Sequence, residues 1–158
     1  MTDMKKILYF LFVIPMLAFM SQSCDDNDTP DVNFHMRFVN ATVSDGDIYV
    51  VQGDTLTVDS AWVTAVNPSH KADLLPPVNY EIAGVGRFVS PFAPYRLAIP
   101  TDSLEVGTYQ FAILGRVAEV NCSLGIGVAQ ATLNVVANAS DIPTGTTSGN
   151  QVDIHRKI

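Results

Sequence analysis

Apolar and polar residues alternate along much of this chain, and this period of two constrains its fold more than any other feature. The clearest alternation covers residues 55–62, and it recurs over 78–82, 95–99 and 108–120. Such a pattern places every second side chain on one face of a β-strand. The sequence after residue 24 shows no α-helical apolar period of useful length. We therefore expect an all-β domain.

The predicted strands are short and are separated by turn residues such as Asp45-Gly46, which readily adopt positive φ. Hydrophobic residues make up 47% of the chain and charged residues 16%, which indicates a globular body with a substantial core. Seven or so strands within about 105 residues fit a β-sandwich. In the alternating pattern Trp62 shares the face of Leu56 and Val58, so we expect it in the core.

A tyrosine near the start of one predicted strand gives a more specific indication of the fold. Leu104-Glu105-Val106-Gly107-Thr108-Tyr109 places a glycine two residues before the tyrosine. This resembles the tyrosine corner of immunoglobulin-like domains, in which the hydroxyl bonds back to the backbone. The resemblance implies one Greek-key β-sandwich over residues 33–136, with Tyr109 in that structural role. The antibody subtype is excluded, because its disulfide and packing tryptophan are absent as a set.

The N-terminal segment has the pattern of an export signal. Lys5 and Lys6 precede the uncharged apolar run 7–20, which is too short for a comfortable bilayer span, and small residues follow before Cys24. Residues 1–23 resemble a bacterial lipoprotein signal peptide. The resemblance implies that Cys24 is lipidated, by fatty acids such as palmitate, and becomes the new N-terminus. The alternatives are a plain cleaved signal with an incidental cysteine, and an N-terminal membrane helix.

The residues directly behind the cysteine are acidic. Asp25, Asp26 and Asp28 resemble the export tag of lipoproteins from Bacteroidota, which sends them to the outer face of the outer membrane. This implies a lipid-anchored protein at the cell surface. We expect residues 24–32 to be a flexible acidic tether and the Ser/Thr/Gly/Asn-rich residues 137–158 to be a flexible tail.

The net charge limits the partners of the chain. The formal net charge is -7 and the sequence pI is about 4.6. An acidic surface without a basic stripe repels phosphate backbones, so nucleic acid is not expected as a partner. Anionic lipid headgroups would be repelled too, so association with a membrane requires the lipid anchor.

The sequence contains few features of a catalytic or metal-binding site. His35, His70 and His155 do not form a metal-ligand pair by their spacing, and no cofactor motif is present. We expect His35 to be a half-buried or surface strand residue. Cys122 has no base or cation as a sequence neighbour, which favours a structural role. Four scattered carboxylates leave a hydrolase as the weakest hypothesis: Asp73, Glu81, Glu105 and Glu119.

Residues 87–95 suggest a ligand platform, because aromatics held between prolines present flat apolar surfaces at small entropic cost. Phe88, Phe92 and Tyr95 are its candidates. In the alternative, Phe88 and Tyr95 point into the core and Phe92 closes one end of the sandwich.

Three triplets resemble the Asp-Ser/Thr-aliphatic site of protein O-glycosylation in Bacteroidota. They make Thr55, Ser60 and Ser103 candidate acceptors. Such triplets also arise by chance in a chain of this size.

These features together predict a non-catalytic binding or adhesion module in the cell envelope, with carbohydrate or an envelope protein as its partner. The alternative is a structural spacer or a subunit of a larger envelope assembly, which would dock through an exposed edge strand.

Overall fold

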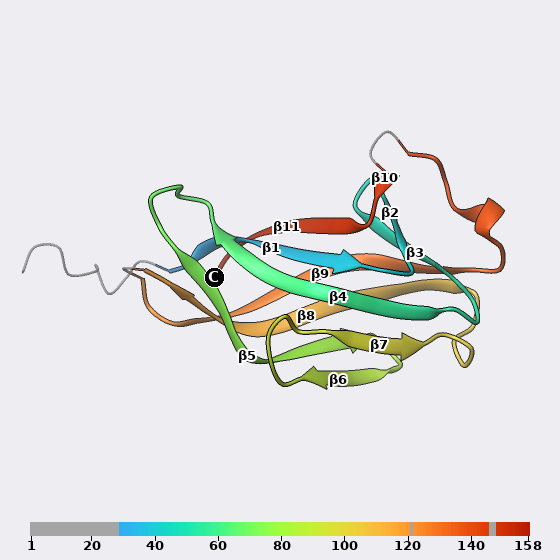
Figure 1. The fold of residues 1–158 in the computed structure, drawn as a ribbon, viewed down its shortest axis with the longest axis horizontal. Coiled ribbons are helices and arrows are strands. Elements are labelled where there is room, and N and C mark those ends of the chain that lie inside the picture. Colours follow the sequence, from blue (N-terminus) through green and yellow to red (C-terminus); the bar gives the residue numbers. More distant parts are fainter. Residues whose placement is uncertain (1–28, 121, 146–147) are drawn as a thin grey trace, which may run out of the picture.

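Two β-sheets pack face to face in the computed structural model, which describes residues 29–120, 122–145 and 148–158 (Figure 1). The predicted all-β sandwich is confirmed. In these ranges the one helical segment is the short turn η1 (Ala139–Asp141), and none is long and apolar enough to cross a membrane. Cys24 and the acidic residues Asp25, Asp26 and Asp28 lie outside the described residues.

The first sheet has four antiparallel strands in the order β11-β1-β4-β7. Its strands are β1 (Asp31–Phe38), β4 (Thr55–Ala65), β7 (Leu97–Pro100) and β11 (Gln151–Lys157).

The second sheet has seven strands in the order β10-β2-β3-β9-β8-β5-β6, antiparallel except for the parallel pair β3 and β9. Its strands are β2 (Thr42–Ser44), β3 (Asp47–Val51), β5 (Ala72–Ile82), β6 (Gly86–Ser90), β8 (Gly107–Glu119), β9 (Gly125–Val136) and β10 (Ser148–Gly149). The predicted turn before β3 is present, with Asp45 at φ 49° and Gly46 at φ 86°. β5 begins at Ala72, before the alternating residues 78–82.

The core lies between the sheets, and its strands show the predicted alternation most clearly at β1, whose every second residue is buried. Phe38 and Tyr80 pack against Phe111 from the two sheets, with ring centroids 6.2 and 5.9 Å apart. Gly127 lets the Phe34 ring lie against β9, because a Cβ there would come 2.5 Å from that ring. Burial of large apolar side chains thus supplies the main stabilisation.

The C-terminal segment is folded, so the prediction of a flexible tail over residues 137–158 was wrong. β11 pairs with β1 along its length, from Asp31 opposite Lys157 to Arg37 opposite Gln151. Val152 is 3% exposed and joins the core. The last two residues of the expected tether, 31 and 32, are likewise in β1. The sandwich therefore extends beyond the predicted bounds of 33–136 at both ends.

One extra residue in β4 changes which side chains face the core. Phe38 of β1 lies opposite Val58 of β4, but the preceding residue of β1, Arg37, lies opposite Ser60. Asp59 is therefore an extra residue in β4, a β-bulge. An insertion of one residue moves the following side chains to the other face. Ala61 and Val63 are therefore buried, and Trp62 points outward. The expectation that Trp62 lies in the core was wrong.

Candidate functional site

The outward Trp62 lies on a surface made by three neighbouring strands. In the register of the four-stranded sheet, His35 of β1 lies opposite Trp62 of β4 on one side and opposite Asp153 of β11 on the other. Arg37 follows two residues later on the same side of β1. We call these outward side chains the Trp62 face: His35, Arg37, Trp62, Thr64, Gln151 and Asp153.

The indole of Trp62 is held by two cationic or polar neighbours. The His35 imidazole stacks on it, with ring centroids 5.1 Å apart and an interplanar angle of 17°. The guanidinium carbon of Arg37 lies 5.4 Å from the ring centroid, within the range of a cation–π interaction. These contacts restrain the orientation of the indole.

His35 is in turn oriented by hydrogen bonds on both ring nitrogens. Its Nδ1 donates to Asp153 Oδ1 at 2.6 Å, and its Nε2 lies 2.7 Å from Thr64 Oγ1. Gln151 Nε2 also donates to Asp153 Oδ1, at 2.8 Å. Partial burial alone would raise the pKa of Asp153, but the hydrogen bonds from His35 and Gln151 lower it below the ordinary value. The half-buried His35 agrees with the expectation from the sequence.

A groove of about 320 Å³ borders Trp62 between β4 and the start of β5. The turn Ala93–Tyr95 lines it as well, and the Ala61 N–H donates to the Pro94 carbonyl at 2.9 Å. Asp73 adds a carboxylate to its lining. The volume falls at the lower end of the range for small-ligand sites. The Trp62 face and this groove form the candidate binding site.

The three aromatics predicted as a platform are not exposed together. Tyr95, at φ 65°, is 3% exposed, and its hydroxyl donates to the Leu74 carbonyl at 2.6 Å. Burial, with a smaller contribution from Asp73, raises its pKa. Phe88 is half-buried and packs against the core, whereas Phe92 is 76% exposed. Of the three aromatic side chains, only that of Phe92 is exposed to a ligand. Phe92 directly precedes the turn that lines the groove.

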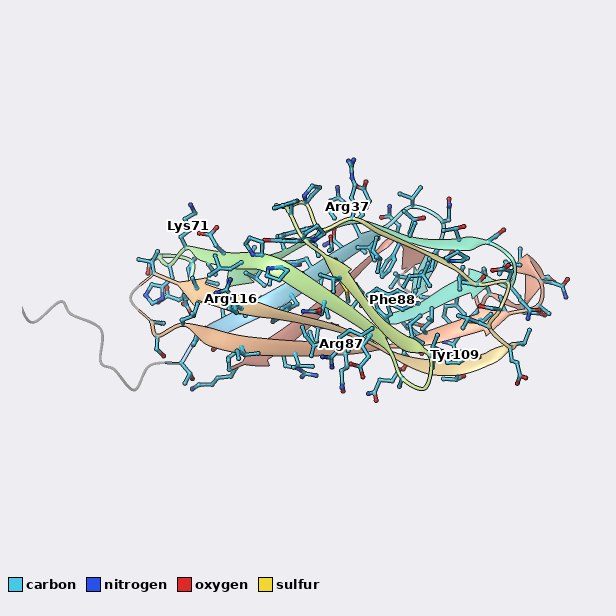
Figure 2. All side chains as sticks on the ribbon, turned by 90° about the horizontal axis from the view of Figure 1, so that it is seen from below. Arg37, Lys71, Arg87, Phe88, Tyr109 and Arg116 are labelled. Atoms are coloured by element: carbon cyan, nitrogen blue, oxygen red, sulfur yellow. The ribbon has the colours of Figure 1, made fainter. Side chains whose placement is uncertain are left out.

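The hydrogen bond predicted for Tyr109 is present. Its hydroxyl donates to the Glu105 carbonyl at 2.8 Å. The bond fixes the chain at the start of β8, toward one end of the molecule, whereas Lys71 lies toward the opposite end (Figure 2).

The three candidate glycosylation acceptors differ in accessibility. Thr55 and Ser60 are half-buried within β4, whereas Ser103 is exposed in the turn before β8. Of the three, Ser103 is placed best for an enzyme to reach.

The four scattered carboxylates contact different partners. Glu81 pairs with Arg87 at 2.7 Å, and Asp73 lies 3.8 Å from Lys71. The Glu119 carboxylate accepts a hydrogen bond from the His70 ring, and the Glu105 backbone carbonyl accepts one from the Tyr109 hydroxyl. The hydrolase hypothesis gains no support from these positions.

Sequence reasoning missed a group of three potential metal ligands. Three potential ligand atoms, one from each of His70, Glu119 and Cys122, lie within 4.8 Å of one another. The pair Glu119-x-x-Cys122 is visible in the sequence, but nothing in it connects this pair with His70, which is 49 residues from Glu119. Only the fold brings the third side chain to the other two.

Comparisons of the chain with protein-family models, with curated proteins and with solved structures each return no match.

Proposed function

We propose that this chain is a non-catalytic binding module of the cell envelope, anchored to the outer membrane by a lipid on Cys24, and that it binds carbohydrate over Trp62. One observation carries the proposal of binding: the only tryptophan of the chain points away from the core, at the rim of a groove. The anchor and the location at the cell surface rest on the resemblance of residues 1–28 to a lipoprotein signal.

An outward indole suits carbohydrate because the C–H faces of a sugar ring pack on flat apolar surfaces. Tryptophan offers the largest such surface and loses little conformational entropy when bound. His35 and Arg37 already restrain the ring, so less ordering remains for the ligand to bring about. The polar members of the Trp62 face, together with Asp73 in the groove, supply donors and acceptors for hydroxyl groups.

The strand order supports an immunoglobulin-like classification. In the first sheet β1, β4 and β7 lie side by side in the order of strands A, B and E of those domains. In the second sheet β9, β8 and β5 lie side by side in the order of strands G, F and C. The hydrogen bond of Tyr109 fits the same scheme. Domains of this kind commonly serve as binding or adhesion modules on cell surfaces.

Substitution of Trp62 on a glycan array tests the proposed binding. Trp62→Ala should abolish the signal of any glycan that the native chain retains. Val89→Ala, at an exposed apolar position on the other sheet, is the matched control and should leave the signal unchanged. A glycan that binds both variants equally would overturn the proposed site. A blank array together with a blank pull-down from cell envelopes would overturn the proposed function.

The proposed anchor has its own test. Metabolic labelling with a fatty acid should mark the native chain and not Cys24→Ala. Label that persists in the variant, or a mature chain that begins at another residue, would contradict lipidation at this position.

The alternative function is a spacer or assembly subunit that docks through an edge strand, and one observation favours it. β6 is one of the two outer strands of the seven-stranded sheet, and its Val89 is 57% exposed. An open edge can pair with another chain. A dimer in solution that Val89→Lys dissociates would favour this function, whereas a monomer would count against it.

A further inference from the structure

His70, Glu119 and Cys122 meet at one end of the sandwich and are separate from the residues of the Trp62 face. We call these three residues the His70 corner. His70 comes from the loop between β4 and β5, Glu119 ends β8, and Cys122 follows it in the connection to β9. Lys71, the neighbour of His70, lies at the end of the molecule in Figure 2.

Glu119 is the fixed centre of the His70 corner. Its side chain is 3% exposed, and its two carboxylate oxygens have different partners. Oε2 accepts the N–H of Asp31 at 2.9 Å, and Oε1 lies 2.7 Å from His70 Nδ1. A carboxylate this buried is stable only when it is paired. Its orientation is therefore determined by the fold.

The hydrogen bonds around His70 show where its proton lies. Asn67 Oδ1 accepts from both the N–H and the hydroxyl of Ser69, so the Asn67 amide nitrogen is the end that faces His70 Nε2, at 3.3 Å. That amide nitrogen donates, so Nε2 accepts and Nδ1 carries the proton. The proton between His70 Nδ1 and Glu119 Oε1 thus occupies the place that a cation between two ligands would take.

Backbone hydrogen bonds connect the segments that carry the three ligands. The N–H of Cys122 donates to the carbonyl of Glu119 at 3.0 Å, and the N–H of Val120 donates to the carbonyl of Lys71 at 2.8 Å. These bonds hold the cysteine beside the glutamate and the histidine loop beside both. A pocket of about 310 Å³ lined by all three ligands leaves room for a water molecule as a fourth.

We propose that the His70 corner binds Zn²⁺, with a water molecule at the fourth position. Imidazole, carboxylate and thiolate together are a donor set that suits Zn²⁺, whereas Mg²⁺ and Ca²⁺ prefer oxygen ligands alone. Two negative ligands balance the charge of the ion. Binding releases the proton of the Cys122 thiol and moves the His70 proton from Nδ1 to Nε2, so that the imidazole stays neutral. The Asn67 side-chain amide must then turn so that its oxygen accepts from Nε2. Tetrahedral bonds of about 2.0–2.3 Å put the ligand atoms about 3.3–3.8 Å apart. Atoms that now lie within 4.8 Å of one another must therefore move closer, and the His70–Glu119 pair at 2.7 Å must open slightly.

The experiment uses the full-length chain in detergent with Cys24→Ala, so that Cys122 is the only thiol. Titration with Co²⁺ as a spectroscopic substitute should give one ion per chain, a thiolate-to-cobalt charge-transfer band, and displacement by Zn²⁺. Cys122→Ser should remove the band. His70→Ala should weaken binding by more than the roughly 10- to 100-fold that loss of an outer-shell partner costs. Glu81→Gln, which removes a surface carboxylate outside both the corner and the Trp62 face, is the control and should bind as the parent does.

Thermal unfolding of each variant separates lost ligands from lost structure. Zn²⁺ should raise the Tm of the parent in proportion to the logarithm of its concentration, and should not raise the Tm of a folded Cys122→Ser chain. Absence of binding, or a band that survives in Cys122→Ser, would overturn the zinc site. Neither result affects the proposed carbohydrate site, because that site uses none of these three residues.

Discussion

The Trp62 face and the His70 corner are built in opposite ways. The Trp62 face is a row of outward side chains from β11, β1 and β4, and the strand register sets their positions. The His70 corner joins two loops to a strand end around a buried carboxylate. A one-residue change in register would therefore remove the face, whereas loss of one hydrogen-bonded partner would disrupt the corner.

Deletion of Asp59 should have the largest effect. Without the bulge residue, the remainder of β4 presents Trp62 and Ser60 inward and turns Ala61 and Val63 outward. We expect the free energy of unfolding to fall by more than about 4 kcal/mol. Urea denaturation measures it. Asp59→Ala keeps the extra residue and loses only a surface contact with Arg96, so it should cost less than about 1 kcal/mol. Equal stability of the two variants would contradict the bulge.

Glu119→Ala should have the next largest effect, confined to the His70 corner. It leaves the N–H of Asp31 and the imidazole of His70 without their acceptor. Loss of a buried acceptor of this kind costs about 2–3 kcal/mol. Glu119→Gln retains a carbonyl oxygen and should cost less. Denaturation curves give both values, and Trp62 fluorescence should not change in either folded variant. A loss below about 0.5 kcal/mol for Glu119→Ala would show that the corner is not held as described.

Trp62→Ala should lower the free energy of unfolding by less than a core substitution does. The ring contributes its contacts with His35 and Arg37 rather than core packing, so we expect a loss of about 1 kcal/mol. Removal of a buried tryptophan or phenylalanine costs about 3–5 kcal/mol. Phe34→Ala, in the core on the neighbouring strand, is the matched comparison. An equal loss of unfolding free energy in the two variants would show that Trp62 is packed in the core.

The pH dependence at Asp153 should be the smallest effect. Its pKa in the folded chain lies below the ordinary value of 3.8. The ionised carboxylate therefore stabilises the fold fully above the unfolded pKa, and this contribution is lost as the pH falls through the folded pKa. Asp153→Asn should flatten the pH dependence of Tm below about pH 4. NMR titration of the carboxyl should give the lowered pKa, and a raised one would contradict the hydrogen bonds from His35 and Gln151.

The sequence predicted the sandwich because apolar and polar residues alternate along its strands, as β1 shows most clearly, and the apolar ones are buried on one side. It placed Trp62 on the wrong face because a bulge leaves little trace in composition. Asp59 and Ser60 are consecutive polar residues, and only the pairing with β1 shows which of them is the extra one.

Two other features depend on contacts between distant parts of the chain. β11 carries only Val152 and Ile154 as apolar residues within Gln151–Lys157, so its sequence resembles a polar tail until it pairs with β1. The His70 corner joins residues 49 positions apart through the closure of a loop. Neither a strand period nor a ligand spacing encodes such a contact, because tertiary structure alone creates it.

Acrylamide quenching of tryptophan fluorescence tests most directly whether Trp62 is the binding surface, because the chain contains a single tryptophan. We predict that the folded chain is quenched readily and that a saturating glycan from the array protects the indole. Quenching as weak as that of a core tryptophan, or quenching that the bound glycan leaves unchanged, would contradict the account.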